Sequence, residues 1–174
     1  MAPAAAEGGG RMNILGRLFP RSLTNAYQGS WAAVWLLAPV LIIKTMIGFN
    51  FSGLNPFISV SEVLQTVDGV PLDTFSPAAV ASIISSAGAW GMALFALCLF
   101  TWLVVVRYRA GLPAAILLLL IEQVGRTGVD TVGLVAEVAA TRAMPAAGAV
   151  INLGMTALLT IAFLLSLLRV KHLN

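Results

Sequence analysis

The sequence predicts an all-α protein: a polytopic membrane four-helix bundle with both termini in the cytoplasm. Hydrophobic residues make up 59% of the 174 positions, charged residues only 10%, and the mean hydropathy is +0.95. These values are typical of membrane proteins that cross the bilayer several times. Four apolar runs are long enough to cross a hydrocarbon core of about 30 Å at about 1.5 Å per helical residue. They cover positions 31–49, 78–106, 112–132 and 146–168.

The placement of basic residues predicts the orientation of these spans. Lys and Arg favour the cytoplasmic side of a membrane, and the two connections on the other side contain only Arg142. The first of these two connections, 50–76, carries three acidic residues and no basic one. Both termini are therefore predicted to be cytoplasmic, on the side that carries Arg11, Arg17, Arg21, Arg107, Arg109, Arg169 and Lys171.

The chain divides into an N-terminal segment, 1–21, and a single four-helix domain, 22–174. Residues 1–10 are rich in Ala and Gly and predict a disordered tail. Residues 12–19 alternate apolar side chains with Arg17, which favours a short helix lying on the inner leaflet. A cleaved signal peptide is disfavoured, because the first apolar run begins only at position 31.

The outer connection carries local signals of its own. Residues 56–67 predict a short amphipathic helix resting at the outer interface, and DGVP at 68–71 predicts a turn. Ser76 and Pro77 are suited to the N-cap and first position of the second long helix. Asp68 and Asp73 offer too few oxygen ligands for a calcium site.

Three ionisable residues interrupt the third apolar segment: Glu122, Arg126 and Asp130, spaced four apart. Glu122 precedes Arg126 at i,i+4, the more favourable order for an ion pair on a helix. An unpaired charge deep in a bilayer costs at least about 2.5–3.5 kcal/mol. Partners for these side chains are therefore expected.

Counting residues from the cytoplasmic ends of the spans places polar groups of three helices at similar depth. At about 1.5 Å per residue, Glu122 lies about 15 Å deep and Arg126 about 21 Å. Lys44 lies about 20 Å deep and Asn152 about 24 Å. With Gln123 beside Glu122, these groups define a candidate intramembrane polar site, in which two cations balance two carboxylates: Lys44, Glu122, Gln123, Arg126, Asp130 and Asn152.

Two interpretations of this site remain open. In the structural one, Lys44 extends outward to the interface, Asp130 lies at the outer surface, and Glu122 with Arg126 holds helices together. In the functional one, the buried carboxylate of Glu122 exchanges a proton near neutral pH. Arg126 would then hold a carboxylate, or the carbonyl of an amphipathic ligand such as a quinone.

The small residues of the long helices are expected to serve close helix packing. They are the ridge Ser85, Ala89 and Ala93 on the second helix and glycines 125, 128, 133, 148 and 154. The lone Cys98 is expected to be a packing or lipid-facing residue.

Other chemistry finds little support in the sequence. The only histidine, His172, lies in the C-terminal tail, so no metal site and no cofactor are expected. No catalytic residue is assigned, because no hydrolase set or phosphate-binding loop occurs. Nucleic-acid binding is not expected, since the basic residues lie at segment ends and form no patch. The four tryptophans are expected to act mainly as interface anchors: Trp31, Trp35, Trp90 and Trp102.

Several segments resemble small four-helix inner-membrane proteins of bacteria. They are KTMIGFN at 44–50, DGVPLDTF at 68–75, RYR at 107–109 and EQVGR at 122–126. The chain is also similar in size and helix number to DoxX-like membrane proteins. The resemblance implies a bacterial inner-membrane location and a four-helix fold, and it implies no activity.

The first hypothesis is a binding or accessory protein with a polar intramembrane pocket or partner interface. Membrane lipids, a lipid or quinone ligand, a membrane-protein partner and a homo-oligomer are the partners considered. The alternative is a proton-coupled transporter or channel subunit with Glu122 as the proton carrier. A membrane-embedded enzyme is the third possibility, and an enzyme is less favoured than a non-enzyme.

Overall fold

The computed structural model describes residues 14–20, 22, 24, 25, 27, 29–131 and 146–168, apart from the side chains at 17, 127, 129–131 and 146–150. Within these residues all regular structure is helical and no strand occurs, which confirms the all-α prediction. Several predictions concern residues outside this description: the tail 1–10, Gly133, Arg142 and the basic residues Arg169 and Lys171. Gly148 lies within the described helix α7, but its surroundings are not described.

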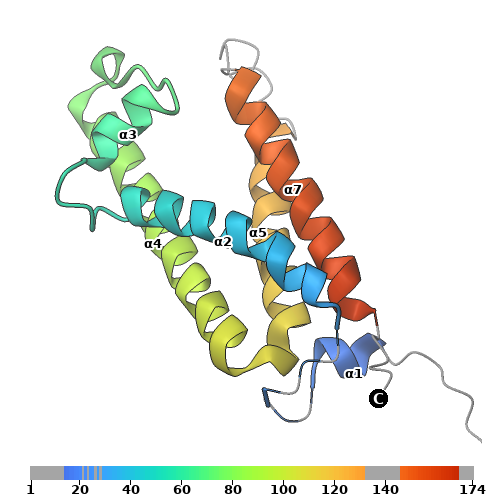
Figure 1. The fold of residues 1–174 in the computed structure, drawn as a ribbon. Coiled ribbons are helices and arrows are strands. Elements are labelled where there is room, and N and C mark those ends of the chain that lie inside the picture. The colour runs from blue at the N-terminus through green and yellow to red at the C-terminus, as the bar shows by residue number, and fades with distance from the viewer. Residues whose placement is uncertain are drawn as a thin grey trace, which may run out of the picture.

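Four long helices form the body of the protein (Figure 1). They lie close to the four predicted apolar segments: α2 is Trp31–Phe51, α4 is Pro77–Arg107, α5 is Leu112–Thr131 and α7 is Ala146–Leu167. The short elements are α1 (Ile14–Leu18), α3 (Val60–Thr66) and the 3₁₀ turns η1 (Leu72–Thr74) and η2 (Arg109–Gly111).

Local capping rules explain where α4 begins and ends. The Ser76 side chain accepts a hydrogen bond from the Ala79 N–H at 3.3 Å, and Pro77 occupies the first turn, as predicted. At the other end Tyr108 leaves helical geometry, with φ −125° and ψ 49°. The turn η2 then reverses the chain, so that α5 starts at the end of the molecule where α4 ends (Figure 1).

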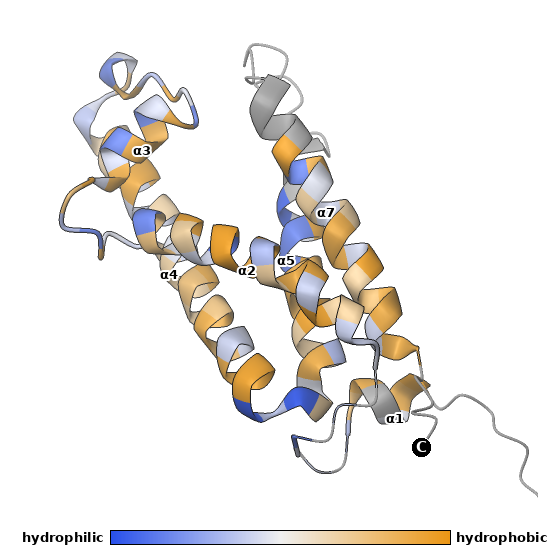
Figure 2. Cartoon of the chain, in the orientation of Figure 1, coloured by the Kyte–Doolittle hydropathy of each residue, from blue (hydrophilic) through white to orange (hydrophobic). Residues whose placement is uncertain are grey.

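Helix α2 crosses the molecule obliquely and packs against both α4 and α7, while α5 packs against α7 and α4 (Figure 1). Away from η2, α4 diverges from the α5 and α7 pair. Among the described residues, α2 and α4 are long and apolar enough to cross a membrane by length and composition. Figure 2 shows hydrophilic residues on α5 in the half away from η2, where Glu122 and Arg126 interrupt its apolar sequence.

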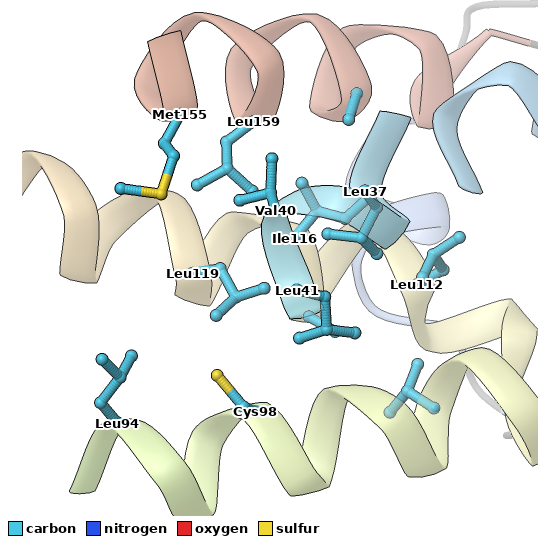
Figure 3. Close-up of a cluster of buried hydrophobic side chains, with 13 residues drawn as sticks. Leu37, Val40, Leu41, Leu94, Cys98, Leu112, Ile116, Leu119, Met155 and Leu159 are labelled. Carbon is cyan, nitrogen blue, oxygen red and sulfur yellow. The ribbon is translucent and has the colours of Figure 1, made fainter. Parts of the chain in front are cut away.

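All four long helices contribute to one apolar core (Figure 3). Its members are between 0% and 4% exposed, and Cys98 at 0% is a packing residue that does not face outward. The labelled members in Figure 3 are Leu37, Val40, Leu41, Leu94, Cys98, Leu112, Ile116, Leu119, Met155 and Leu159. The core ends where the next turns of α2, α5 and α7 carry polar residues instead.

Two glycines let α2 and α4 approach closely. A Cβ added at Gly48 would lie 2.7 Å from the Phe95 backbone nitrogen of α4. A Cβ added at Gly91 would lie 2.6 Å from the Ser52 nitrogen and against the Phe51 backbone, just where α2 ends. Each helix therefore offers a glycine to the backbone of the other, and this reciprocal contact fixes their crossing.

Among the described residues, three glycines of α5 and α7 lack the close packing that was expected for them. A Cβ added at Gly125, Gly128 or Gly154 would meet no atom within 4 Å. On α4, the ridge of Ser85, Ala89 and Ala93 is likewise exposed. The spacing of small residues along a helix shows which of them share a side, but it does not show whether that side faces a neighbouring helix.

The connection between α2 and α4 folds onto the ends of these two helices. Its helix α3 is shorter than the predicted 56–67, and it buries Val63 and Leu64 against Phe51. The predicted turn is present: Gly69 has φ 64°, and the Val70 N–H donates to the Leu64 carbonyl at 2.9 Å. The apolar side of α3 thus faces the protein, not the outer interface as expected.

At the η2 end of the molecule, aromatic rings pack against each other and against an arginine. Arg109 lies over the Trp31 ring, 5.0 Å from its centroid, and Trp31 stacks edge-on with Tyr27. The Tyr27 hydroxyl donates to the Ser30 carbonyl at 3.0 Å, and burial raises the pKa of Tyr27 to about 12. The helix α1 packs nearby against α5, α7 and η2, with Ile14 and Leu15 at least half exposed.

Candidate functional site

A buried ion pair joins α2 to α5 at the end of the core away from η2. The Lys44 ammonium donates to Glu122 Oε2, and Lys44 is only 1% exposed. Val40 and Leu41, one turn earlier on α2, and Leu119, one turn earlier on α5, belong to the apolar core. Lys44 therefore does not extend outward to the interface, which contradicts the structural interpretation on this point.

The second cation of the site, Arg126, reaches three helices at once. One guanidinium nitrogen donates to Asn152 Oδ1 of α7 at 2.8 Å and to Gln123 Oε1 of its own helix at 3.4 Å. The guanidinium carbon also lies 5.6 Å from the centroid of the Trp90 ring of α4. Such a contact over a tryptophan face is favourable for a cation.

The predicted i,i+4 pair of Glu122 and Arg126 is present but loose. Arg126 Nε and Glu122 Oε1 are 3.8 Å apart, and neither buried atom has a hydrogen-bond partner. The closer partner of Glu122 is Lys44 from another helix. Arg126 is thus held by α7 and α4 more than by its neighbour in sequence.

Five of the six residues of the candidate site come together in space. Gln123 is fully buried and donates to the Asn152 carbonyl at 3.4 Å, while Asn152 accepts from Arg126 through its side chain. The sixth residue, Asp130, lies on α5, and its side chain falls outside the described part of the structure. Depth counting along three separate helices thus predicted a real cluster: Lys44, Glu122, Gln123, Arg126 and Asn152.

Sequence reasoning missed the role of two tryptophans. Trp90 is partly buried between the Arg126 guanidinium and the Phe51 ring, whose centroid is 5.3 Å away. Trp102 donates through its indole N–H to Thr45 Oγ1 at 3.1 Å, next to Lys44. The same depth count would have found Trp90, since it lies about 25 Å from the Arg107 end of α4, level with Asn152. Trp31 and Trp35, by contrast, are 47% and 76% exposed, as anchors require.

The cluster brings together two cations, one carboxylate and two side-chain amides. Within the described residues, no group of three or more His, Cys, Asp or Glu side chains could hold a metal ion. Lys44 is enclosed and paired, whereas Arg126 remains 29% exposed. A guanidinium on a partly exposed side chain can bind a carboxylate or another oxygen acceptor.

Comparison with known proteins gives no match: no family model, no curated protein and no solved structure is similar to this chain.

Proposed function

We propose that this chain is a four-span protein of a bacterial inner membrane, with both termini in the cytoplasm. The membrane-compatible length and composition of α2 and α4 support this, as does the apolar sequence of α7. Exposed apolar side chains on the long helices, such as Trp35 at 76% and Ile121 at 58%, suit a lipid environment. The excess of basic residues at the η2 end supports the orientation.

The proposed topology predicts that successive connections between the helices are accessible from opposite sides of the membrane. In spheroplasts, cysteines introduced at Gln65 and Thr141 should react with a membrane-impermeant maleimide. Cysteines at Ser22 and Ala110 should react only after permeabilisation. The native Cys98 is fully buried, so the unmodified chain is the control for background labelling. Labelling of all four positions from one side would refute the four-span topology.

Within this protein, we propose that the polar cluster binds the head of an amphipathic ligand through Arg126. The ligand class is a lipid-like molecule whose head offers a carboxylate or carbonyl oxygen. The observation that carries the proposal is the contrast between the two cations: Lys44 is enclosed by the core and paired with Glu122, but the side chain of Arg126 is 29% exposed.

The Arg126→Gln variant is expected to lose this ligand. A hydrogen bond to a charged group contributes about 1.5–3 kcal/mol, so affinity should fall roughly 10- to 100-fold. The full chain and the variant are purified in mild detergent, and the co-purifying small molecules are extracted and identified by mass spectrometry. Arg107→Gln, which removes an exposed cation at the end of α4, is the matched control.

The expected result is one class of acceptor-bearing amphiphile that the wild type and Arg107→Gln retain and Arg126→Gln does not. Arg126→Lys should lose most of it, because Lys cannot reproduce the planar fork of the guanidinium. Identical small molecules in all four preparations would overturn the proposal. Co-purification of a protein that depends on Arg126 would also overturn it, in favour of a partner interface.

A further inference from the structure

The loop between α2 and α3 presents apolar side chains away from the rest of the chain. Leu54 is 49% exposed, Phe57 90% and Ile58 37%. No charged residue occurs between Lys44 and Glu62, so the sequence around the loop is neutral. The neighbouring helix α3 behaves differently, because its apolar residues are buried against the protein.

Hydrogen bonds tie this loop to the last turn of α2. The Asn55 side-chain amide donates to Asn50 Oδ1 at 2.8 Å, and Asn55 Oδ1 accepts from the Phe57 N–H at 2.9 Å. Ser52 accepts from the Leu54 N–H at 3.2 Å, and Gly53 makes the turn with φ 74°. These hydrogen bonds hold the loop against the C-terminal end of α2.

The length of α2 places that end at a membrane boundary. Its 21 residues span about 31 Å, close to the hydrocarbon thickness of about 30 Å. In Figure 1 the loop leaves the end of α2 and passes beside α4 on the side away from α5 and α7, before α3 begins. Figure 2 shows apolar residues along it.

We propose that this loop is an outer-leaflet anchor, in which Leu54, Phe57 and Ile58 insert among the lipid headgroups and upper acyl chains. The inference rests on the proposed membrane topology. Apolar and aromatic side chains next to a neutral backbone turn are suited to that interfacial layer. The sequence predicted that 56–67 rests at the outer interface; the anchor keeps Phe57 and Ile58 of that segment and adds Leu54, whereas Val63 and Leu64 are buried against the protein.

The experiment measures the depth of three labelled positions in the full chain. Cysteines are introduced singly at Phe57, Leu99 and Gln65, labelled with an environment-sensitive nitrobenzoxadiazole dye, and reconstituted into phosphatidylethanolamine and phosphatidylglycerol vesicles. Leu99 is a 50% exposed position within α4, and Gln65 is an exposed position of α3. Lipids with nitroxides in the headgroup or deep in the acyl chain serve as quenchers.

For the Phe57 position we expect blue-shifted emission and stronger quenching by the shallow nitroxide than by the deep one. The Leu99 position should be quenched best by the deep nitroxide, and the Gln65 position should emit as in water. If the Phe57 dye emits as in water while the Leu99 dye lies in lipid, the anchor is refuted and the membrane topology stands. If the Leu99 dye also emits as in water, the proposed topology fails together with the anchor.

Discussion

Replacing Lys44 with methionine is expected to lower the free energy of unfolding by about 3–5 kcal/mol, the usual cost of breaking a buried ion pair by removing one partner. The substitution leaves the Glu122 carboxylate with only Arg126 Nε nearby, at 3.8 Å and without a hydrogen bond. Glu122→Gln should cost a similar amount, because it leaves the ammonium of a side chain that is 1% exposed without a counter-charge.

The double variant Lys44→Met/Glu122→Gln should be close to the wild type in stability. Methionine fills much of the volume of the lysine stem, and both charges of the buried Lys44–Glu122 pair are removed together. The glutamine amide at position 122 keeps an oxygen facing Arg126 that can accept a hydrogen bond. Recovery in the double variant would separate the penalty of an unpaired charge from any loss of packing.

Unfolding in mixed detergent micelles, followed by circular dichroism, measures these differences. Glu62→Gln makes the same chemical change at an exposed position of α3 and should stay within about 0.5 kcal/mol of the wild type. Interhelical polar contacts in a membrane protein average only about 0.6 kcal/mol. If each single variant lowers the free energy of unfolding by no more than this amount, the pair behaves as an average interhelical polar contact and not as a buried charge pair.

Local rules were enough to predict the helical class and the helix ends. Ser76 and Pro77 predicted the start of α4, because an N-cap and a first-turn proline act within a few residues. The turn at Gly69 followed from its sequence for the same reason. The short α3 was less predictable, since its apolar side pairs with Phe51 of a distant helix, and no local pattern specifies that contact.

The membership of the polar site was predictable from depth, but its pairing was not. Helical rise alone placed Lys44, Glu122, Arg126 and Asn152 at similar depth, and the structure joins all four. The sequence favoured Arg126 as the partner of Glu122, whereas Lys44 makes the closer contact. Partner choice depends on how far each helix is rotated about its axis, and tertiary packing fixes that rotation.

The rotation of α2 traces to Gly48, one turn beyond Lys44. Its contact with the Phe95 backbone seats that side of α2 against α4. Lys44, one turn earlier, lies on the same side of α2, and its ammonium donates to Glu122 on α5. Gly125, Gly128 and Gly154, which the sequence made conspicuous, have no such contact with the described residues.

Gly91→Ala is expected to destabilise the protein by about 1–3 kcal/mol, the usual range for overpacking. The new methyl group would lie 2.6 Å from the Ser52 nitrogen and 2.5 Å from the Phe51 Cβ. Backbone atoms cannot move aside as a flexible side chain can, so α2 and α4 must separate. Gly91→Leu should cost more than Gly91→Ala, because a larger side chain enters the same contact.

The matched control is Gly125→Ala, where an added Cβ meets no atom within 4 Å. Alanine is a better helix former than glycine by about 0.8–1.0 kcal/mol, so this variant should equal or exceed the wild type in the same unfolding measurement. Separation of α2 from α4 should also displace Trp90, next to Gly91, from the Arg126 guanidinium and weaken ligand retention together with stability. Equal stability of Gly91→Ala and Gly125→Ala would mean that α2 and α4 do not cross closely at Gly91.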